Sequence, residues 1–546
     1  MRGTHYKPAA SAKDLGRHPG DRPIDLLLTL KHPGQLLAER SAPHDDPIWQ
    51  QLPHERTGPT QATSPPTDAP DPGPLTAFAE QFGLALDLSD INQGLVHLHG
   101  SVAQVEKAFD IVMHDFEEEG SVHRGHHGEP RVPRIISDVV DAVVGLHSRP
   151  LARPRVATAS VHAPQRSLSY DEVAKIFSYP QGLTGRRTRV GIIQLGGGFQ
   201  QSDIDAFCAS LGRNAPSIDV VEVAGATNSP EPTQEVQKFV SWMCEAAKDP
   251  GSVGPPPSVG IATVEATMDI QLVTSLAPDT AITVFFAPNN NIGAFLAFKQ
   301  AIVADDIDTI VCTWSWNESE ESASSAINRF LAQCPHRKKT FITSSGDQGS
   351  RGHANDAAAL NPQFPATSPY VLSVGGVSLS QGSDGVWSQC VWNTEALGMA
   401  SGGGFSLLEQ RPAWQAAAID AAASSAESKG RGLPDVALLA DAALSCQVYV
   451  AGGWLPAAGT SAAAPLWGAL VARMNERMKA QTGAVLGYLT PLVYRLAREQ
   501  SRCFHDIVEG NNGAYQAGTG WDACTGVGTP RGEQLLAALL GDEPAV

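Results

Sequence analysis

The segment Gly459-Thr460-Ser461-Ala462-Ala463-Ala464-Pro465 decides how the fold of this chain is interpreted. A strand-like apolar run from Cys446 to Leu455 precedes it. After it, apolar residues between Trp467 and Met474 recur at i, i+3, i+4 and i+7, a spacing that predicts a helix. Ser461 is therefore expected at a strand-to-helix turn, near a helix N-terminus, where negative charge is favoured.

Ser461 has two interpretations. Gly459 permits a tight turn, and the small alanines leave space around the hydroxyl, as a nucleophilic serine requires. Alternatively, Ser461 is an N-cap residue in front of an alanine-rich helix. The local sequence favours the N-cap, so the rest of the chain has to decide.

A serine nucleophile needs a base, which is usually histidine. Thirteen of the sixteen histidines precede residue 165. The other three are His336 in a basic loop, His353 in a glycine-rich loop and His505 beside an aspartate. None of them has an evident relation to the end of a strand, so we expect a carboxylate as the base for Ser461.

Glu265 and Asp269 are four residues apart and therefore share one face of a predicted helix. Such a pair is ordinarily solvated, but these are the only charged side chains between Asp249 and Asp279. Repulsion between them on a largely apolar helix couples their ionisation and raises one pKa. Two carboxyl groups that share protons can perform general acid–base catalysis at acidic pH.

Asp347 follows a predicted short strand, within Ser344-Ser345-Gly346-Asp347-Gln348-Gly349. It is either an ordinary turn residue or a protonated carboxyl group that donates a hydrogen bond to a developing oxyanion. The second interpretation requires a neutral Asp347, and hence acidic conditions or a raised pKa.

An oxygen-rich loop lies near the C-terminus. Asp506-Ile507 is followed by Gly518-Thr519-Gly520-Trp521-Asp522, which combines two acids with closely spaced glycine carbonyls and suits calcium. The pattern is not that of an EF-hand, and a pair of turns containing Asp and Gly explains it equally well.

Composition excludes several classes of protein. An apolar content of 42% with 18% charged residues indicates a globular protein, and a net charge of −18 argues against a nucleic-acid partner. No apolar run approaches the roughly 20 residues of a membrane span, and the N-terminus lacks a secretory apolar region. The eight cysteines, all beyond residue 200, are widely spaced and form either disulfides or scattered core thiols.

Residues 1 to about 165 are predicted to form a separate, small α+β unit. Strands are expected at 24–31 and 95–100, helices at 75–82 and 101–109, and short helices or turns at 33–39 and 46–51. A basic, proline-interrupted linker from Ser148 to Pro164 ends the unit and is a preferred site of proteolytic nicking. Acidification would charge the many histidines of this unit. Either the docking of the unit on its neighbour responds to pH, or the histidine enrichment has no role.

From about residue 166, predicted strands and helices alternate. Strands are expected at 189–195, 218–223, 281–287, 309–314, 340–343 and 370–374, with helices between them. This alternation predicts an α/β fold with a mostly parallel sheet covered on both faces. Ligands bind at the carboxyl ends of such strands, where Ser461 and the loop of Asp347 are expected to converge.

Together these segments resemble the sedolisin family of serine-carboxyl peptidases, most closely its kumamolisin-like bacterial members. The resemblance covers nearly the whole chain, and it rests on motifs that occur in the family's order: Gly196-Gly197-Gly198, Glu265-x-x-x-Asp269, Ser345-Gly346-Asp347, Ser401 to Ser406, Leu433-Pro434-Asp435-Val436, Gly459-Thr460-Ser461 and the loop from Asp506 to Pro530. It implies an activation propeptide at 1–165, with its linker at about 148–165. A subtilisin-like peptidase domain at 166–546 would follow, with a calcium loop at 506–530.

The resemblance also implies a role for each site residue. Ser461 would be the nucleophile and Glu265 the base, while Asp269 would orient Glu265 and share its protons. Asp347 would be the oxyanion donor. One structural Ca²⁺ would be bound by the side chains of Asp506 and Asp522 and the carbonyls of Ile507, Gly518 and Gly520.

The resemblance implies that this chain is the self-processing zymogen of an acid-active endopeptidase. Its partners would be polypeptide substrates and its own propeptide, with no nucleic acid or membrane, and it would be a secreted monomer. Two alternatives remain: a tripeptidyl aminopeptidase of the same family, and a catalytically weak, calcium-stabilised binding protein. Departures from the family pattern at four positions leave the pH optimum and the cleavage preference open: Gln194, Asn317, Gln348 and Gln363.

Overall fold

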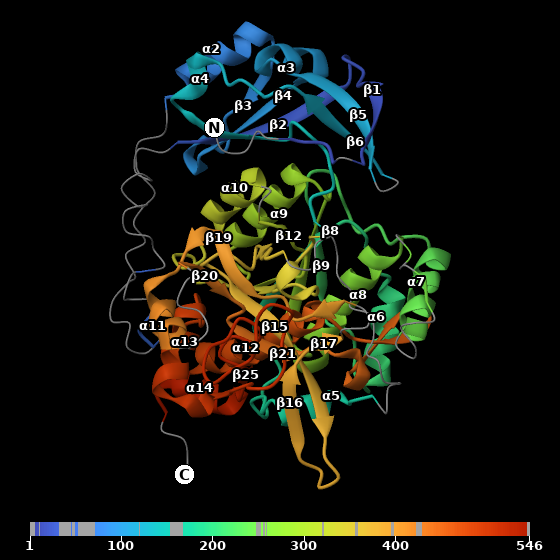
Figure 1. Ribbon diagram of the computed structural model, residues 1–546, viewed down its shortest axis with the longest axis vertical. Coiled ribbons are helices and arrows are strands. Elements are labelled where there is room, and N and C mark those ends of the chain that lie inside the picture. Colours follow the sequence, from blue (N-terminus) through green and yellow to red (C-terminus); the bar gives the residue numbers. More distant parts are fainter. Residues whose placement is uncertain are drawn as a thin grey trace.

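A computed structural model describes residues 6–9, 11–31, 45, 50–52, 71–118, 121–152, 167–246, 253–254, 257, 259–318, 321–354, 359–394, 398–421 and 429–542. They form a small N-terminal unit, drawn in blue and cyan at the top of Figure 1, and a larger C-terminal unit below it. No helix among these residues is long and apolar enough to cross a membrane.

The C-terminal unit is built on an eight-stranded sheet. Along the sheet the strands run β16 (Trp387–Val391), β15 (Leu372–Gln381), β13 (Thr340–Ser344), β11 (Thr309–Cys312), β8 (Arg189–Leu195), β10 (Ala281–Ala287) and β9 (Ile218–Glu222), and β21 (Val436–Leu439) also pairs with β15. Only β16 is antiparallel to its neighbour. The predicted mostly parallel sheet is thus confirmed.

Helices cover both faces of this sheet. Ile192 of β8 belongs to the core beneath α8 (Ile261–Leu276) and α12 (Thr460–Thr482), whereas its neighbour Ile193 belongs to the core beneath α9 (Asn291–Val303) and α10 (Glu321–Leu331). Successive strand residues point to opposite faces, so a strand buried on both sides is apolar throughout. That is why the sequence alone located β8 and β10 to the residue.

The segment before Ser461 differs from its prediction. The run from Cys446 to Leu455 was expected to be one strand, but it forms a hairpin of β22 (Gln447–Val450) and β23 (Gly453–Pro456). Ala451 and Gly452 make the turn with positive φ values of 50° and 85°. A glycine here allows the left-handed turn that divides an otherwise continuous apolar run.

The N-terminal unit contains two sheets. A four-stranded sheet has the order β3 (Ala85–Asp87), β4 (Leu95–Ser101), β2 (Pro23–Leu30), β7 (Val140–Val144), and it carries α2 (Gly73–Phe82), α3 (Val102–Phe109) and α4 (Arg134–Ser137). The strands predicted at 24–31 and 95–100 and the helices predicted at 75–82 and 101–109 are confirmed, including the N-cap Ser101 of α3. A second sheet of β1 (Lys13–Arg17), β5 (Val112–Glu118) and β6 (Ser121–His127) was not predicted.

The four-stranded sheet lies on α9 and α10 of the C-terminal unit (Figure 1). Leu28 packs inside the N-terminal unit, whereas Leu27, on the opposite face of β2, joins the apolar cluster that contains α9. Lys299 of α9 forms an ion pair with Asp90 at 2.5 Å. The two units therefore share both an apolar contact and charged contacts.

Several predictions fall partly outside the described residues. The linker expected from Ser148 to Pro164 is described only as far as Ala152, and the short helices expected at 33–39 and 46–51 are described only at Gln50 and Gln51. At the linker's start, Asn289 Oδ1 accepts hydrogen bonds from the backbone N–H groups of Leu151 and Ala152. All eight cysteines are free thiols, which agrees with the core-thiol interpretation.

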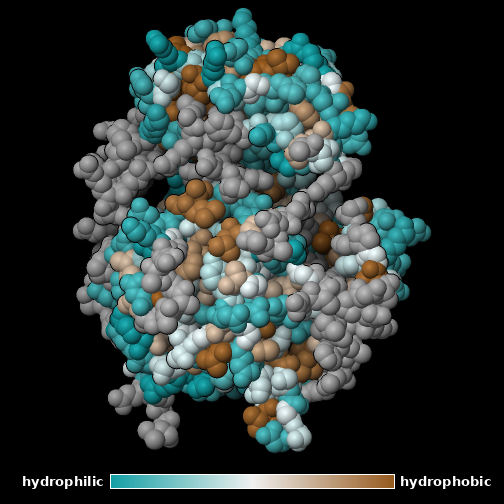
Figure 2. Space-filling view, viewed as in Figure 1, coloured by the Kyte–Doolittle hydropathy of each residue, from teal (hydrophilic) through white to brown (hydrophobic). Residues whose placement is uncertain are grey.

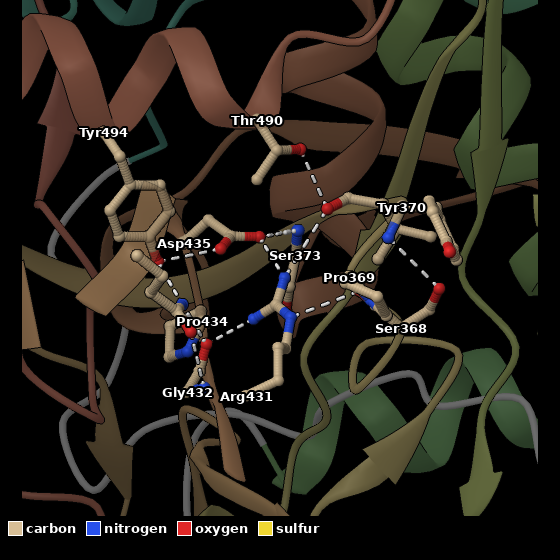
Figure 3. Close-up of polar contacts among 12 residues, drawn as sticks. Ser368, Pro369, Tyr370, Ser373, Arg431, Gly432, Pro434, Asp435, Thr490 and Tyr494 are labelled. Atoms are coloured by element: carbon tan, nitrogen blue, oxygen red, sulfur yellow. Dashed lines mark hydrogen bonds and ion pairs between the residues drawn. The ribbon is translucent and has the colours of Figure 1, made fainter. Parts of the chain in front are cut away.

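A buried ion pair holds the end of β20 (Gly430–Leu433) against the sheet (Figure 3). Arg431 and Asp435 are both fully buried, and an Arg431 nitrogen lies 2.6 Å from Asp435 Oδ2. Tyr494 Oη and the Ser373 N–H also donate to the Asp435 carboxylate, at 2.9 and 2.7 Å. Burial raises the pKa of Asp435, and the Arg431 guanidinium opposes this rise.

We expect Arg431→Met to lower the free energy of unfolding by about 3–5 kcal/mol, because it leaves a buried carboxylate without its counter-charge. The measurement is urea unfolding of the full-length chain. Arg186→Met is the matched control, since Arg186 and Asp279 form an exposed pair at 2.8 Å whose attraction is screened by solvent and which is expected to contribute far less. Equal losses in the two variants would contradict this prediction.

Candidate active site

Ser461 is the second residue of α12, and Gly459 is the N-cap of this helix with a φ of 84°. The N-cap interpretation of Ser461 is therefore wrong, because the cap position needs a backbone conformation that glycine adopts at little cost. Ser461 is fully buried, and its Oγ forms no hydrogen bond with the described residues. Its hydroxyl is held at a helix N-terminus, where the helix dipole favours negative charge.

Glu265 and Asp269 lie on α8, which packs directly against α12. Both side chains are fully buried, so the surface-pair alternative is wrong. Burial raises the pKa of Glu265 well above its usual value, and the nearby Asp269 carboxylate raises it further. Two adjacent buried carboxyl groups cannot both ionise at low cost, so the pair retains a proton to higher pH than isolated acids do.

The contact between Ser461 and Glu265 is close but not a well-formed hydrogen bond. The hydroxyls of Ser461 and Thr313 lie near enough to Glu265 to lower its pKa, against the larger effects of burial and of Asp269. Neither carboxylate oxygen of Glu265, however, forms a hydrogen bond with the described residues. Catalytic hydrogen bonds are often long in a free enzyme and shorten when substrate binds.

Asp269 is positioned by two donors on neighbouring strand ends. Gln194 Nε2 donates to Asp269 Oδ2 at 2.7 Å, and Thr313 Oγ1 donates to the same oxygen at 2.9 Å. Trp314 Nε1 in turn donates to Gln194 Oε1 at 2.8 Å, which fixes the orientation of the amide. Gln194 therefore supplies an amide donor whose charge does not change with pH.

Asp347 lies beside the start of α12. Its Oδ1 accepts hydrogen bonds from the backbone N–H of Thr460 at 2.8 Å and from Thr460 Oγ1 at 2.6 Å. Since Thr460 immediately precedes Ser461, the carboxyl group is held next to the serine. The Asp347 charge is also one of the smaller influences that raise the pKa of Glu265. The structure thus brings together all four side chains predicted for the site.

Sequence reasoning missed the supporting threonines. Thr313 contacts Asp269 and Thr460 contacts Asp347, and both are fully buried. A threonine at the end of a predicted strand carries no signal of such a role, because its partner lies 44 or 113 residues away in the chain. The one available signal was position: each threonine lies at the end of a strand or the start of a helix, on the side of the sheet where ligands are expected to bind.

Two further positions that depart from the expected pattern lie side by side. Asn317 of β12 (Trp316–Asn317) pairs with Gln363 of β14 (Gln363–Phe364). Gln363 Oε1 accepts a hydrogen bond from Ser315 at 2.9 Å, and Asn317 Oδ1 accepts one from Asn361 at 2.8 Å. Both side chains are neutral amides, so neither carries the charge that an acid would bring to this position.

The two acids of the C-terminal loop face one turn. Asp506 Oδ2 accepts a hydrogen bond from Gly520 N–H at 2.9 Å, and Asp522 Oδ2 accepts one from Gly518 N–H at 3.3 Å. Asp522 is buried, and burial raises its pKa to about 6. Two carboxylates converge on the same glycine-containing turn, which matches the oxygen ligands that calcium prefers.

Comparisons with known proteins agree with this geometry. Residues 61–149 match a family described as Pro-kumamolisin, activation domain. The structure of Pseudomonas sedolisin (serine-carboxyl proteinase) complexed with two molecules of pseudo-iodotyrostatin aligns with a TM-score of 0.58 and 26% identity, covering 70% of this chain and 99% of that one. The chain belongs to the sedolisin family of serine-carboxyl peptidases.

Within the family, the similarity to one relative spans the full length. The chain is 34% identical to kumamolisin from Bacillus sp. (strain MN-32) over 99% of its own length and 96% of that protein. It is also 31% identical to tripeptidyl-peptidase 1 from Homo sapiens, over 52% of each chain. The protein is thus a serine-carboxyl peptidase that carries an activation domain.

Proposed function

We propose that this chain is the zymogen of an acid-active endopeptidase that removes its own propeptide. Residues 1–165 would be the propeptide and 166–546 the peptidase domain. The observation that carries the proposal is the convergence of Ser461, Glu265, Asp269 and Asp347 in one buried site. Polypeptides would be the substrates, and the similarity to bacterial kumamolisin and sedolisin supports a secreted enzyme.

In the proposed reaction, Ser461 Oγ attacks the carbonyl carbon of a peptide bond while Glu265 accepts the hydroxyl proton. The proton then passes to the leaving amine, and an ester to Ser461 remains. Water attacks this ester with Glu265 again as base, which releases the carboxylic acid and restores the serine. Asp269, held by Gln194 and Thr313, keeps Glu265 oriented and shares its proton.

Asp347 would stabilise the tetrahedral intermediates of both steps. Its Oδ1 is engaged by Thr460, so the proton that reaches the substrate oxyanion belongs on Oδ2. Asp347 can donate this hydrogen bond only when its carboxyl group is protonated, and acidic conditions favour that neutral form. The same conditions favour the shared proton on Glu265 and Asp269.

Product mapping tests this proposal against the alternatives. The full-length chain is incubated with a denatured protein at pH 4 and at pH 7, and the products are sequenced by mass spectrometry. We expect internal cleavage at pH 4. Sequential release of tripeptides would instead support the alternative that the similarity to tripeptidyl-peptidase 1 suggests. Absence of any cleavage would leave the binding-protein alternative.

We also propose that the C-terminal loop binds one structural Ca²⁺ ion through the side chains of Asp506 and Asp522 and the carbonyls of Ile507, Gly518 and Gly520. The two carboxylates already face one turn. When bound, the ion would neutralise them and tie residues 506–507 to 518–522. It is a stabilising ligand and takes no part in the steps above.

Removal of calcium is expected to lower the melting temperature of the full-length chain. A ligand present at 100 times its dissociation constant stabilises the folded state by about 2.7 kcal/mol, and a chelator removes this contribution. The measurement is thermal unfolding with calcium and with EGTA. Asp522→Asn serves as control, because its melting temperature should respond far less to EGTA. A parent protein indifferent to EGTA would contradict the calcium assignment.

A further inference from the structure

The second sheet of the N-terminal unit gathers an aspartate and two histidines on one face. Asp14 of β1 lies opposite Phe116 of β5, and His127 of β6 lies opposite Val112 of β5. His114 stands between these two positions on β5, and residues two apart on a strand share a face. The register of three strands therefore places Asp14, His114 and His127 together.

Their ligand atoms converge. His114 Nδ1 lies 2.8 Å from Asp14 Oδ1, and His127 Nε2 lies 2.8 Å from Asp14 Oδ2. One atom from each of the three side chains lies within 4.8 Å of the other two. The two imidazole rings are edge to face, with centroids 4.5 Å apart. Side-chain exposures of 39%, 19% and 50% for Asp14, His114 and His127 leave the cluster open to solvent.

We propose that Asp14, His114 and His127 bind a divalent transition-metal ion, for which zinc is the best match. Two imidazole nitrogens and one carboxylate oxygen are a ligand set that zinc takes in protein sites, with water completing a tetrahedron. Tetrahedral ligands at zinc distances are separated by about 3.3 Å, so the side chains need to part only slightly from their present contacts. The backbone N–H of Gly16 donates to Asp14 Oδ1 at 2.8 Å and orients the carboxylate, as outer partners of metal ligands do.

Other histidine–carboxylate contacts in the unit show what sets this cluster apart. His99 Nδ1 lies 2.6 Å from Asp25 Oδ1, and His18 Nδ1 lies 2.7 Å from Asp115 Oδ1. Within the described residues, neither pair belongs to a group of three converging ligands. They are ordinary hydrogen-bonded pairs, whereas the cluster offers three ligands from three strands. A bound ion would fasten the edge strand β1 to β5 and β6.

The test is a zinc titration of the full-length Ser461→Ala chain at neutral pH, followed by calorimetry, with excess calcium present to occupy the acidic loop. The Ser461→Ala background keeps the chain intact, so the result does not depend on the proposed peptidase function. We expect one equivalent of zinc to bind and the melting temperature of the N-terminal unit to rise, with no rise on addition of magnesium.

Variants locate the site. His114→Gln combined with His127→Gln is expected to weaken zinc binding at least tenfold, and Asp14→Asn alone to weaken it measurably. His99→Gln, which removes a comparable surface imidazole, is the matched control and should bind zinc like the parent. Circular dichroism of each variant reports whether the fold is retained. Binding of zinc by the double variant as tightly as by the parent, or no stoichiometric binding by the parent, would overturn the proposal.

Discussion

The Ser461→Ala chain is expected to remain intact at acidic pH, whereas the wild-type chain loses an N-terminal fragment of propeptide size. The substitution removes the only atom proposed to form the ester intermediate. Loss of a nucleophile of this kind lowers the rate by roughly 10⁴- to 10⁶-fold. Intact mass measured over time at pH 4 and pH 7 reports both the cleavage and its position.

Ser275→Ala is the matched control for this experiment. Ser275 is also a buried helical serine, but its hydroxyl donates to the Leu272 carbonyl at 2.7 Å, at the far end of α8 from Glu265. This variant should process like the wild type. Cleavage in the Ser461→Ala chain at the wild-type rate would rule out Ser461 as the nucleophile, whatever the activity on added substrates.

Glu265→Gln is expected to lower kcat/KM by roughly 10²- to 10⁴-fold at every pH, because a neutral amide cannot accept the serine proton. Gln and Glu have nearly the same shape, so the buried packing around α8 is kept. The measurement is hydrolysis of a fluorogenic peptide across pH 3 to 8. Activity within tenfold of the wild type would move the role of base to another group.

Asp269→Asn should instead shift the pH profile. Burial and the Asp269 charge both raise the pKa of Glu265, so removal of that charge lowers it. Glu265 must be ionised to act as base, and a lower pKa lets it ionise in more acidic solution. The acidic limb of the kcat/KM profile is therefore expected to move to lower pH. A shift toward higher pH would contradict the coupling inferred for this pair.

The sequence predicted most of the catalytic unit because its signals are local. β8 and β10 are buried on both faces and are apolar throughout, so their bounds needed no knowledge of the fold. Glu265 and Asp269 stood out because no cation lies near them in sequence. Both features follow from a few adjacent residues and from the period of one helix or strand.

What escaped prediction depends on contacts between distant segments. The β1–β5–β6 sheet was missed because β5 and β6 are rich in histidine and acidic residues and lack the apolar alternation of a half-buried strand. The hydrogen bond from Thr460 to Asp347 joins residues 113 apart, and only the folded chain shows it. The hairpin before Ser461 was missed although Gly452-Gly453 interrupts the apolar run, because the run was interpreted as one strand across these glycines.

Strand β2 is buried on both of its faces, and this has a consequence for the proposed mature enzyme. Leu27 packs into an apolar cluster that also contains Phe295 and Phe298 of α9. If the N-terminal unit is released as proposed, these apolar side chains are exposed to water, and the hydrophobic effect favours covering them again. A released propeptide would therefore tend to bind again at its original position, and full activity would come only after the enzyme has digested it. The onset of activity in a concentrated sample should accordingly lag behind the first cut and then accelerate.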